Sequence, residues 1–110
     1  MRSHQELIRT LYLEKDSARG PSLTYLCLSE EMGELARAIL NNDRENLQEE
    51  MADTLAWLFS LANVCDIDLE DAFLKKYPLS CVKCNENPCC CIMRKKGIPE
   101  EGEEEGEGDE

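Results

Sequence analysis

The strongest constraint on the fold is a pair of long helical segments separated by three residues. Residues 22–40 and 44–64 carry apolar side chains at helical spacing, and the second segment is rich in Leu, Ala, Met and Glu, which are strong helix formers. Between them, Asn41 and Asn42 suit a left-handed turn and Asp43 suits the N-cap of the next helix. Because so short a connection makes consecutive helices antiparallel neighbours, we expect a helical hairpin.

Two further helices complete an expected all-α protomer of four helices. The first spans about 3–17 and ends at the Gly20-Pro21 pair, and the last spans about 69–77, between a cap at Asp68 and a stop at Pro78. No strand-like alternation or internal repeat competes with this pattern. A chain of 110 residues with a tail that cannot fold leaves only a modest core, so we expect a helical bundle formed by oligomerisation, as a homodimer or homotetramer.

Composition divides the chain into three parts and excludes some partners. We expect a helical domain over 1–78, a Cys-rich segment over 79–96 and a disordered acidic tail over 97–110. Residues 100–110 hold eight acids and no base, so that the rest of the chain has sixteen acids, twelve bases and a net charge of −4. Without a basic stripe, nucleic acid is not an expected partner. No apolar run is long enough for a membrane span and no signal-peptide core is present, so we expect a soluble, cytoplasmic protein.

The two hairpin helices each carry acidic residues beside an apolar stripe. Glu31 and Glu34 lie about 60° apart around the first helix, and Glu50 and Asp53 repeat that spacing on the second. In an antiparallel hairpin these edges can face each other and gather four carboxylates. Such crowding costs several kcal/mol through repulsion and desolvation unless a cation offsets it. Oxygen ligands without imidazole indicate Mg²⁺, with Mn²⁺ as an alternative.

Two other interpretations of these acids are weighed against a metal site. Acids at helical spacing are commonly solvated surface residues, but no Lys or Arg follows Glu31, Glu50 or Asp53 at i+4 to pair with them. A ferritin-like di-metal bundle needs Glu-x-x-His motifs on two helices. The only histidine is His4, outside both acidic motifs, and we assign it no role.

The acidic motifs resemble those of a known family. Glu30-Glu31-Met32-Gly33-Glu34, fifteen intervening residues and Glu50-Met51-Ala52-Asp53 resemble the EExxE…ExxD signature of MazG-like nucleotide pyrophosphohydrolases, all-α enzymes related to dimeric dUTPases and dCTP pyrophosphatases. The resemblance extends from the first helix to about Tyr77 and includes "GELARAI" and "DTLAWLF". It implies hydrolysis of a nucleoside triphosphate between the α and β phosphates. It also implies that Glu31, Glu34, Glu50 and Asp53 bind Mg²⁺, with Glu30 as the first acid of the motif and a candidate base; Glu49 is a second candidate.

Four residues are candidates for substrate contacts, each with a purely structural alternative. Trp57 falls in line with Glu50 and Asp53 and could stack on a nucleobase, or it could be a core aromatic. Lys75 and Lys76 could reach the β and γ phosphates, although the helix dipole alone favours lysines near a C-terminus. Arg19, beside the Gly20-Pro21 break, could act from a loop that closes over substrate.

The Cys-rich segment offers a possible second metal site. Cys81, Cys84, Cys89 and Cys91 supply four thiolates at spacings that suit a compact structural Zn²⁺ site, with a disulfide or free thiols as alternatives. Cys90 makes the ligand choice ambiguous, because three adjacent cysteines cannot all bind one ion. We expect Cys27 and Cys65 to be small buried hydrophobes.

If the acids serve only solubility, the alternative function is a non-enzymatic helical module that binds a partner through its zinc-stabilised tail.

Overall fold

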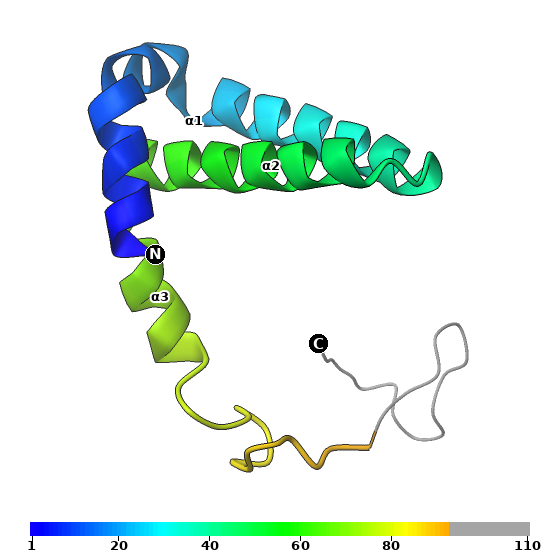
Figure 1. Cartoon of the computed structure of the whole chain (residues 1–110). Coiled ribbons are helices and arrows are strands. Elements are labelled where there is room, and N and C mark those ends of the chain that lie inside the picture. The colour runs from blue at the N-terminus through cyan, green and yellow to red at the C-terminus, as the bar shows by residue number, and fades with distance from the viewer. Residues whose placement is uncertain (93–110) are drawn as a thin grey trace. The chain divides into compact units, whose positions relative to one another are not determined.

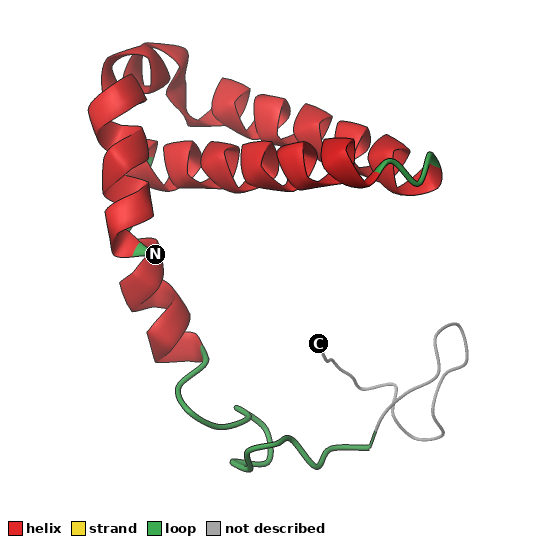
Figure 2. Cartoon of the chain, viewed as in Figure 1, coloured by secondary structure: helices red, strands yellow, loops and turns green. Residues whose placement is uncertain are grey.

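The structure, a computed structural model, describes residues 1–92 and is all-α in that range, as predicted. It contains α1 (Arg2–Leu40), α2 (Arg44–Val64) and α3 (Leu69–Lys76), and no strand occurs in the described part of the chain (Figures 1 and 2). None of these helices is long and apolar enough to cross a membrane. The predicted acidic tail over 97–110 and the end of the Cys-rich segment lie outside the described residues.

The predicted break between the first two helices coincides with a kink in α1, which joins two helical stretches in one element. The backbone is non-helical at Gly20, with φ 85° and ψ 167°, and Pro21 follows it within α1. That conformation is nearly restricted to glycine, while proline suits the first position of the next helical stretch because no N–H is needed there. Figure 1 shows the chain changing direction at this kink, so that α1 has two differently directed halves.

The predicted hairpin is present between the second half of α1 and α2. Asn42 has φ 56°, and the Asp43 carboxylate accepts a hydrogen bond from the Asn46 N–H at 3.2 Å. The second half of α1 and α2 lie side by side and run antiparallel, joined by this turn (Figure 1). Their packing sets the acidic motif of α1 against that of α2.

The first half of α1 is fixed to the far end of α2 by a buried glutamine. Gln5 Nε2 donates to Asn63 Oδ1 at 2.9 Å and to the Ile67 carbonyl at 2.8 Å, and Gln5 Oε1 accepts from the Leu69 N–H at 3.0 Å. Arg2 adds an exposed ion pair with Asp68 at 2.9 Å. These bonds join the start of α1 to the α2–α3 connection and thereby orient the half of α1 that ends at the kink.

The protomer buries few large apolar side chains. Leu28, Ala38, Phe59 and Ala62 form its buried apolar core, whereas many large hydrophobic residues of both α1 and α2 are exposed. Those on α1 include Leu7, Leu11, Leu23, Tyr25, Leu26, Met32 and Ile39. An apolar surface of this extent is typical of chains that associate.

Residues from Lys76 onward form a second compact unit, separate from Met1–Lys75. Within its described part, turns rather than helices dominate after Lys76. The Cys81 N–H donates to the Glu86 carbonyl at 3.0 Å, and the Asn85 N–H donates to the Cys81 carbonyl at 2.8 Å. These bonds fold the chain back so that its cysteines approach one another.

Candidate functional site

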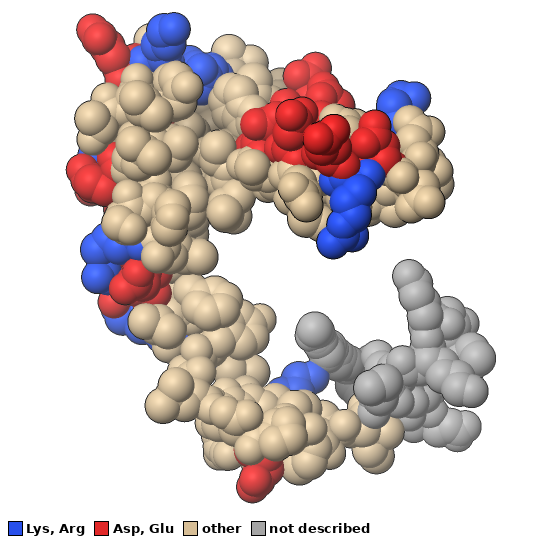
Figure 3. Space-filling model, in the orientation of Figure 1, with Lys and Arg blue, Asp and Glu red and all other residues tan. Residues whose placement is uncertain are grey.

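The hairpin brings together three of the predicted acidic residues. Glu31 of α1 and Glu50 and Asp53 of α2 each have a carboxylate oxygen within 4.8 Å of the other two. Acidic side chains gather over this part of α1 and α2 in Figure 3. The three oxygens are close enough to bind one cation together.

Two of these carboxylates have a buried oxygen without a hydrogen-bond partner. Glu31 Oε1 and Glu50 Oε1 are both inaccessible to solvent and unpaired. Burial raises the pKa of Glu31 to about 7, aided by a hydrogen bond to Glu50 in the protonated form and by the negative charges of Glu34, Glu50 and Asp53. Unpaired buried carboxylates are costly, and a divalent cation would satisfy them.

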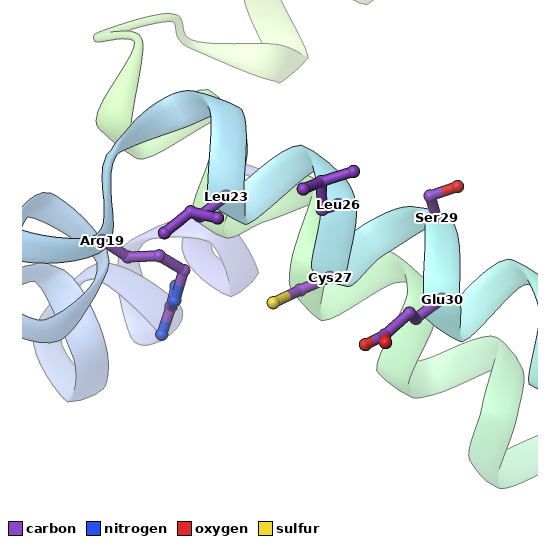
Figure 4. A pocket seen from close by; sticks show the side chains of 6 residues that line it. All are labelled: Arg19, Leu23, Leu26, Cys27, Ser29 and Glu30. Atoms are coloured by element: carbon purple, nitrogen blue, oxygen red, sulfur yellow. The ribbon is translucent and has the colours of Figure 1, made fainter.

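The other two glutamates of the first motif lie apart from this group. Glu34 is exposed and lies outside the set of oxygens within 4.8 Å, although its charge acts on Glu31. Glu30 instead lines an open cavity of about 710 Å³ together with Arg19, Leu23, Leu26, Cys27 and Ser29 (Figure 4). The side chains of Glu30 and Glu31 therefore lie on different parts of the surface, because consecutive residues in a helix are about 100° apart.

A second cavity adjoins the acidic group. It has a volume of about 360 Å³ and lies between the first half of α1 and α2. Asp53 belongs both to its lining and to the three acids described above. The remaining lining residues are Tyr12, Lys15, Asp16, Arg19, Ala56, Trp57 and Ser60. The acidic group thus borders a hollow with aromatic and polar walls.

Asp16 is a buried acid in this cavity that sequence reasoning missed. It is only 2% exposed; its Oδ1 accepts from Arg19 Nη1 at 2.7 Å, and its Oδ2 is buried without a partner. The Arg19 guanidinium lies 4.8 Å from the centroid of the Trp57 ring. The i,i+3 spacing of Asp16 and Arg19 just before the Gly20-Pro21 pair was the available signal.

Arg19 does not occupy the loop that we expected. It lies within α1 at the kink, where the ion pair with Asp16 and the contact with Trp57 hold its guanidinium. The guanidinium lies over Trp57, so Arg19 orients one wall of the cavity.

A comparison with known families agrees with this geometry. Residues 19–81, more than half of the chain, match the MazG nucleotide pyrophosphohydrolase domain. The chain belongs to this family. The resemblance noted from the acidic motifs is therefore confirmed, while no curated protein matches the chain.

The MazG match covers the acidic group but not every residue beside it. Glu31, Glu50, Asp53 and Trp57 fall inside the matched range, whereas Tyr12 and Asp16 precede it. The part of α1 that carries Asp16 is joined to the matched region by the hydrogen bond of Gln5 to Asn63 and by the ion pair of Asp16 with Arg19. Three of the eight residues that line the cavity, Tyr12, Lys15 and Asp16, precede the matched range.

The two predicted lysines lie within the match at the end of α3 and are exposed. Lys75 Nζ lies 3.5 Å from a carboxylate oxygen of Asp71, and Lys76 Nζ lies 5.6 Å from the centroid of the Tyr77 ring. Neither lysine lines either of the two cavities described above. Their predicted contact with phosphate stays a prediction.

The Cys-rich segment brings together the four predicted sulfur ligands. Of its cysteines, only Cys81 falls within the match. Cys81, Cys84, Cys89 and Cys91 have sulfur atoms within 4.8 Å of one another, and Cys90 lies outside this group. A hydrogen bond from the Cys90 N–H, with a second from the Glu86 N–H, lowers the pKa of Cys84 to about 6. The segment therefore forms a sulfur-rich cluster of its own.

The remaining two cysteines are less buried than expected. Cys27 is half-buried and lines the open cavity beside Glu30. Cys65 is exposed, so the expectation that it is a buried hydrophobe was wrong. Cys65 is the C-cap of α2, so it lies where the helix ends rather than within its packed length.

Proposed function

We propose that the chain is a Mg²⁺-dependent nucleoside triphosphate pyrophosphohydrolase that cuts between the α and β phosphates to give a monophosphate and pyrophosphate. The observation that carries the proposal is the group of three acids, two of them with unpaired buried oxygens, beside a cavity with a tryptophan wall. Family membership supports the same reaction class.

Glu31, Glu50 and Asp53 would hold the metal, and Glu34 is the proposed fourth ligand. Their oxygens suit Mg²⁺, and Mn²⁺ would suit the same set. The exposed His4 lies at the start of α1 and takes no part. When bound, the metal would offset the charge of the triphosphate and lower the pKa of the attacking water.

A further carboxylate would accept the proton of that water. Glu30 and Glu49 are both candidates: Glu30 precedes Glu31 on α1, and Glu49 precedes Glu50 on α2. Replacing the true base by glutamine should lower kcat and leave Mg²⁺ affinity unchanged. The same replacement of the other glutamate should leave kcat near the wild-type value.

The cavity of about 360 Å³ is the proposed nucleoside site, since its volume falls in the range of small-molecule pockets. Trp57 would stack on the base, and Asp16 Oδ2 would accept a hydrogen bond from an N–H or O–H of the nucleoside. Arg19 would orient both residues through the contacts that it already makes. Lys75 and Lys76 are the proposed contacts of the β and γ phosphates.

Association into a dimer or tetramer is part of this proposal. The protomer's exposed apolar residues on α1 and α2 would be covered by another copy. A partner copy would also close the open cavity that Glu30 and Arg19 line. Size-exclusion chromatography with light scattering measures the oligomeric state directly.

The function is tested by pyrophosphate release from a panel of normal and modified nucleoside triphosphates with Mg²⁺. Glu34→Gln and Asp53→Asn should abolish release, whereas Glu45→Gln, on the exposed first turn of α2, should keep it. No release from any triphosphate at high protein concentration would reject the enzyme. That result would favour the alternative of a helical interaction module.

A further inference from the structure

We propose that Cys81, Cys84, Cys89 and Cys91 form a tetrahedral zinc site that holds the segment after α3 in its folded conformation, with Cys90 excluded from the ion. The site belongs to the unit that begins at Lys76 and contains no residue of the acidic group. The inference therefore does not depend on the proposed hydrolase activity.

The spacing of the sulfur atoms fits a common central ion. Cys81 Sγ lies 3.9 Å from Cys91 Sγ, and Cys84 Sγ lies 4.0 Å from Cys89 Sγ. A zinc ion with Zn–S bonds of about 2.3 Å in tetrahedral geometry places its sulfurs about 3.8 Å apart. A disulfide would require about 2.05 Å. The sulfurs are thus too far apart to be bonded in pairs and close enough to share one ion.

Backbone groups are also arranged as they are around thiolate ligands. The Lys83 N–H donates to Cys81 Sγ at 3.4 Å, the Cys90 N–H donates to Cys84 Sγ at 3.4 Å, and the Cys91 N–H donates to Cys89 Sγ at 3.3 Å. Three of the four proposed ligands therefore accept a backbone hydrogen bond. Such bonds favour the deprotonated sulfur that zinc requires and orient it toward the ion.

Cys90 contributes its backbone rather than its side chain. Its N–H donates to Cys84, while its sulfur lies outside the group of four. The Cys90 side chain is hydrogen-bonded to Cys84, so it borders the group of four without belonging to it. The choice among three adjacent cysteines therefore follows from which sulfurs all lie within 4.8 Å of one another.

Residues 79–92, the part of the segment that the structure describes, have no apolar core that could hold this geometry. Leu79 and Ile92 are 85% and 84% exposed, and Val82 is 50% exposed. A segment this short commonly needs a metal or a disulfide to fold. Four thiolates in tetrahedral geometry select zinc over Mg²⁺ or Ca²⁺.

Metal content of the purified full chain, with any affinity tag removed, tests the proposal. We expect one zinc per chain, released in step with the titration of four thiols by a mercurial reagent. Substitution by Co²⁺ should give the sulfur-to-metal charge-transfer and ligand-field bands of a tetrahedral four-thiolate site. The wild-type measurements remain decisive even if a variant fails to fold.

Two cysteine variants form a matched pair. Cys84→Ser should lose the zinc, whereas Cys90→Ser should keep it. The proposal is overturned by protein that holds no zinc and has all its thiols titratable, by disulfides in freshly isolated protein, by iron in place of zinc, or by loss of zinc in Cys90→Ser alone. Any of these results would leave the test of pyrophosphate release unaffected.

Discussion

The acidic group on α1 and α2 and the cysteine cluster after α3 are two candidate metal sites whose residues are held in different ways. The acids come from the second half of α1 and from α2, which pack together as a hairpin. The cysteines come from one short stretch whose apolar residues are exposed. The first set is positioned by the scaffold, whereas the second would be positioned by its ion. Metal removal should therefore abolish activity at the acidic group without unfolding the helices, whereas it should unfold the cysteine segment.

The largest expected effect is on catalysis. Glu50→Gln should lower pyrophosphate release at least about 100-fold, because it removes one of the proposed metal ligands and the remaining acids cannot take its place. In Mg²⁺-free buffer the same variant should melt at a higher temperature than the wild type, because it relieves repulsion with Glu31. Activity assays and thermal melts measure both. Loss of activity together with loss of helical signal would instead mean that Glu50 is needed for folding.

The next largest effect is on local unfolding, and chelation of zinc should produce it at the cysteine segment alone. A strong zinc chelator should raise amide hydrogen exchange over residues 79–91 by about tenfold or more, since metal binding and folding are coupled there. Exchange in α1 and α2 should stay unchanged. Removal of Mg²⁺ alone should change neither region. Equal loss of protection in both regions would show that the cysteine segment and the helices unfold together.

A smaller effect, on protein stability, is expected from substitutions at the two glycines of α1. Gly20→Ala should destabilise the protein by about 1–3 kcal/mol, because φ 85° with ψ 167° is strained for alanine, although no atom lies within 4 Å of the added Cβ. Gly33→Ala, in regular helix with equally open space, should stabilise by about 0.5–1 kcal/mol. Urea denaturation measures both. Destabilisation by Gly33→Ala would show that another chain packs closely at that position.

The smallest expected effect is a pH dependence that arises from Glu31. Because burial raises the pKa of Glu31 to about 7, the protonated form is favoured in the folded state. The stability that this provides is present at low pH and is lost as pH rises from about 5 to 8. Backbone N–H groups and Arg2 lower the pKa values of Asp68 and Glu70. The stability that these two carboxylates contribute is therefore lost only as pH falls below their usual range, outside the interval in which Glu31 titrates.

Thermal melts without Mg²⁺ should therefore show a melting temperature that falls by a few degrees over this pH range. The fall should vanish in Glu31→Gln and shrink when Mg²⁺ is added. An identical slope in wild type and Glu31→Gln would assign the pH dependence to other groups.

Much of the fold was predictable because it depends on neighbouring residues. The Asp43 cap, the left-handed Asn42 and the facing acids Glu31 and Glu50 follow from turn chemistry and helical period. The interruption at Gly20 and Pro21 was also predictable from local chemistry, and the backbone is non-helical at Gly20. The direction of the stretch before the kink was not predictable, because it depends on the bonds of Gln5 to Asn63 and Ile67, which are distant in the sequence.

The sequence by itself determined the helical hairpin, the acidic edges and the spacing of the cysteines, because helical period and turn preferences act over one or two turns of chain. Only the tertiary structure decided that Glu31 and Glu50 each bury an unpaired oxygen, that Asp53 borders a cavity with Trp57, and that Asp16 is buried. The burial of a side chain, and its effect on the pKa of that side chain, depend on which distant segments pack together. The sequence near each residue therefore could not reveal them.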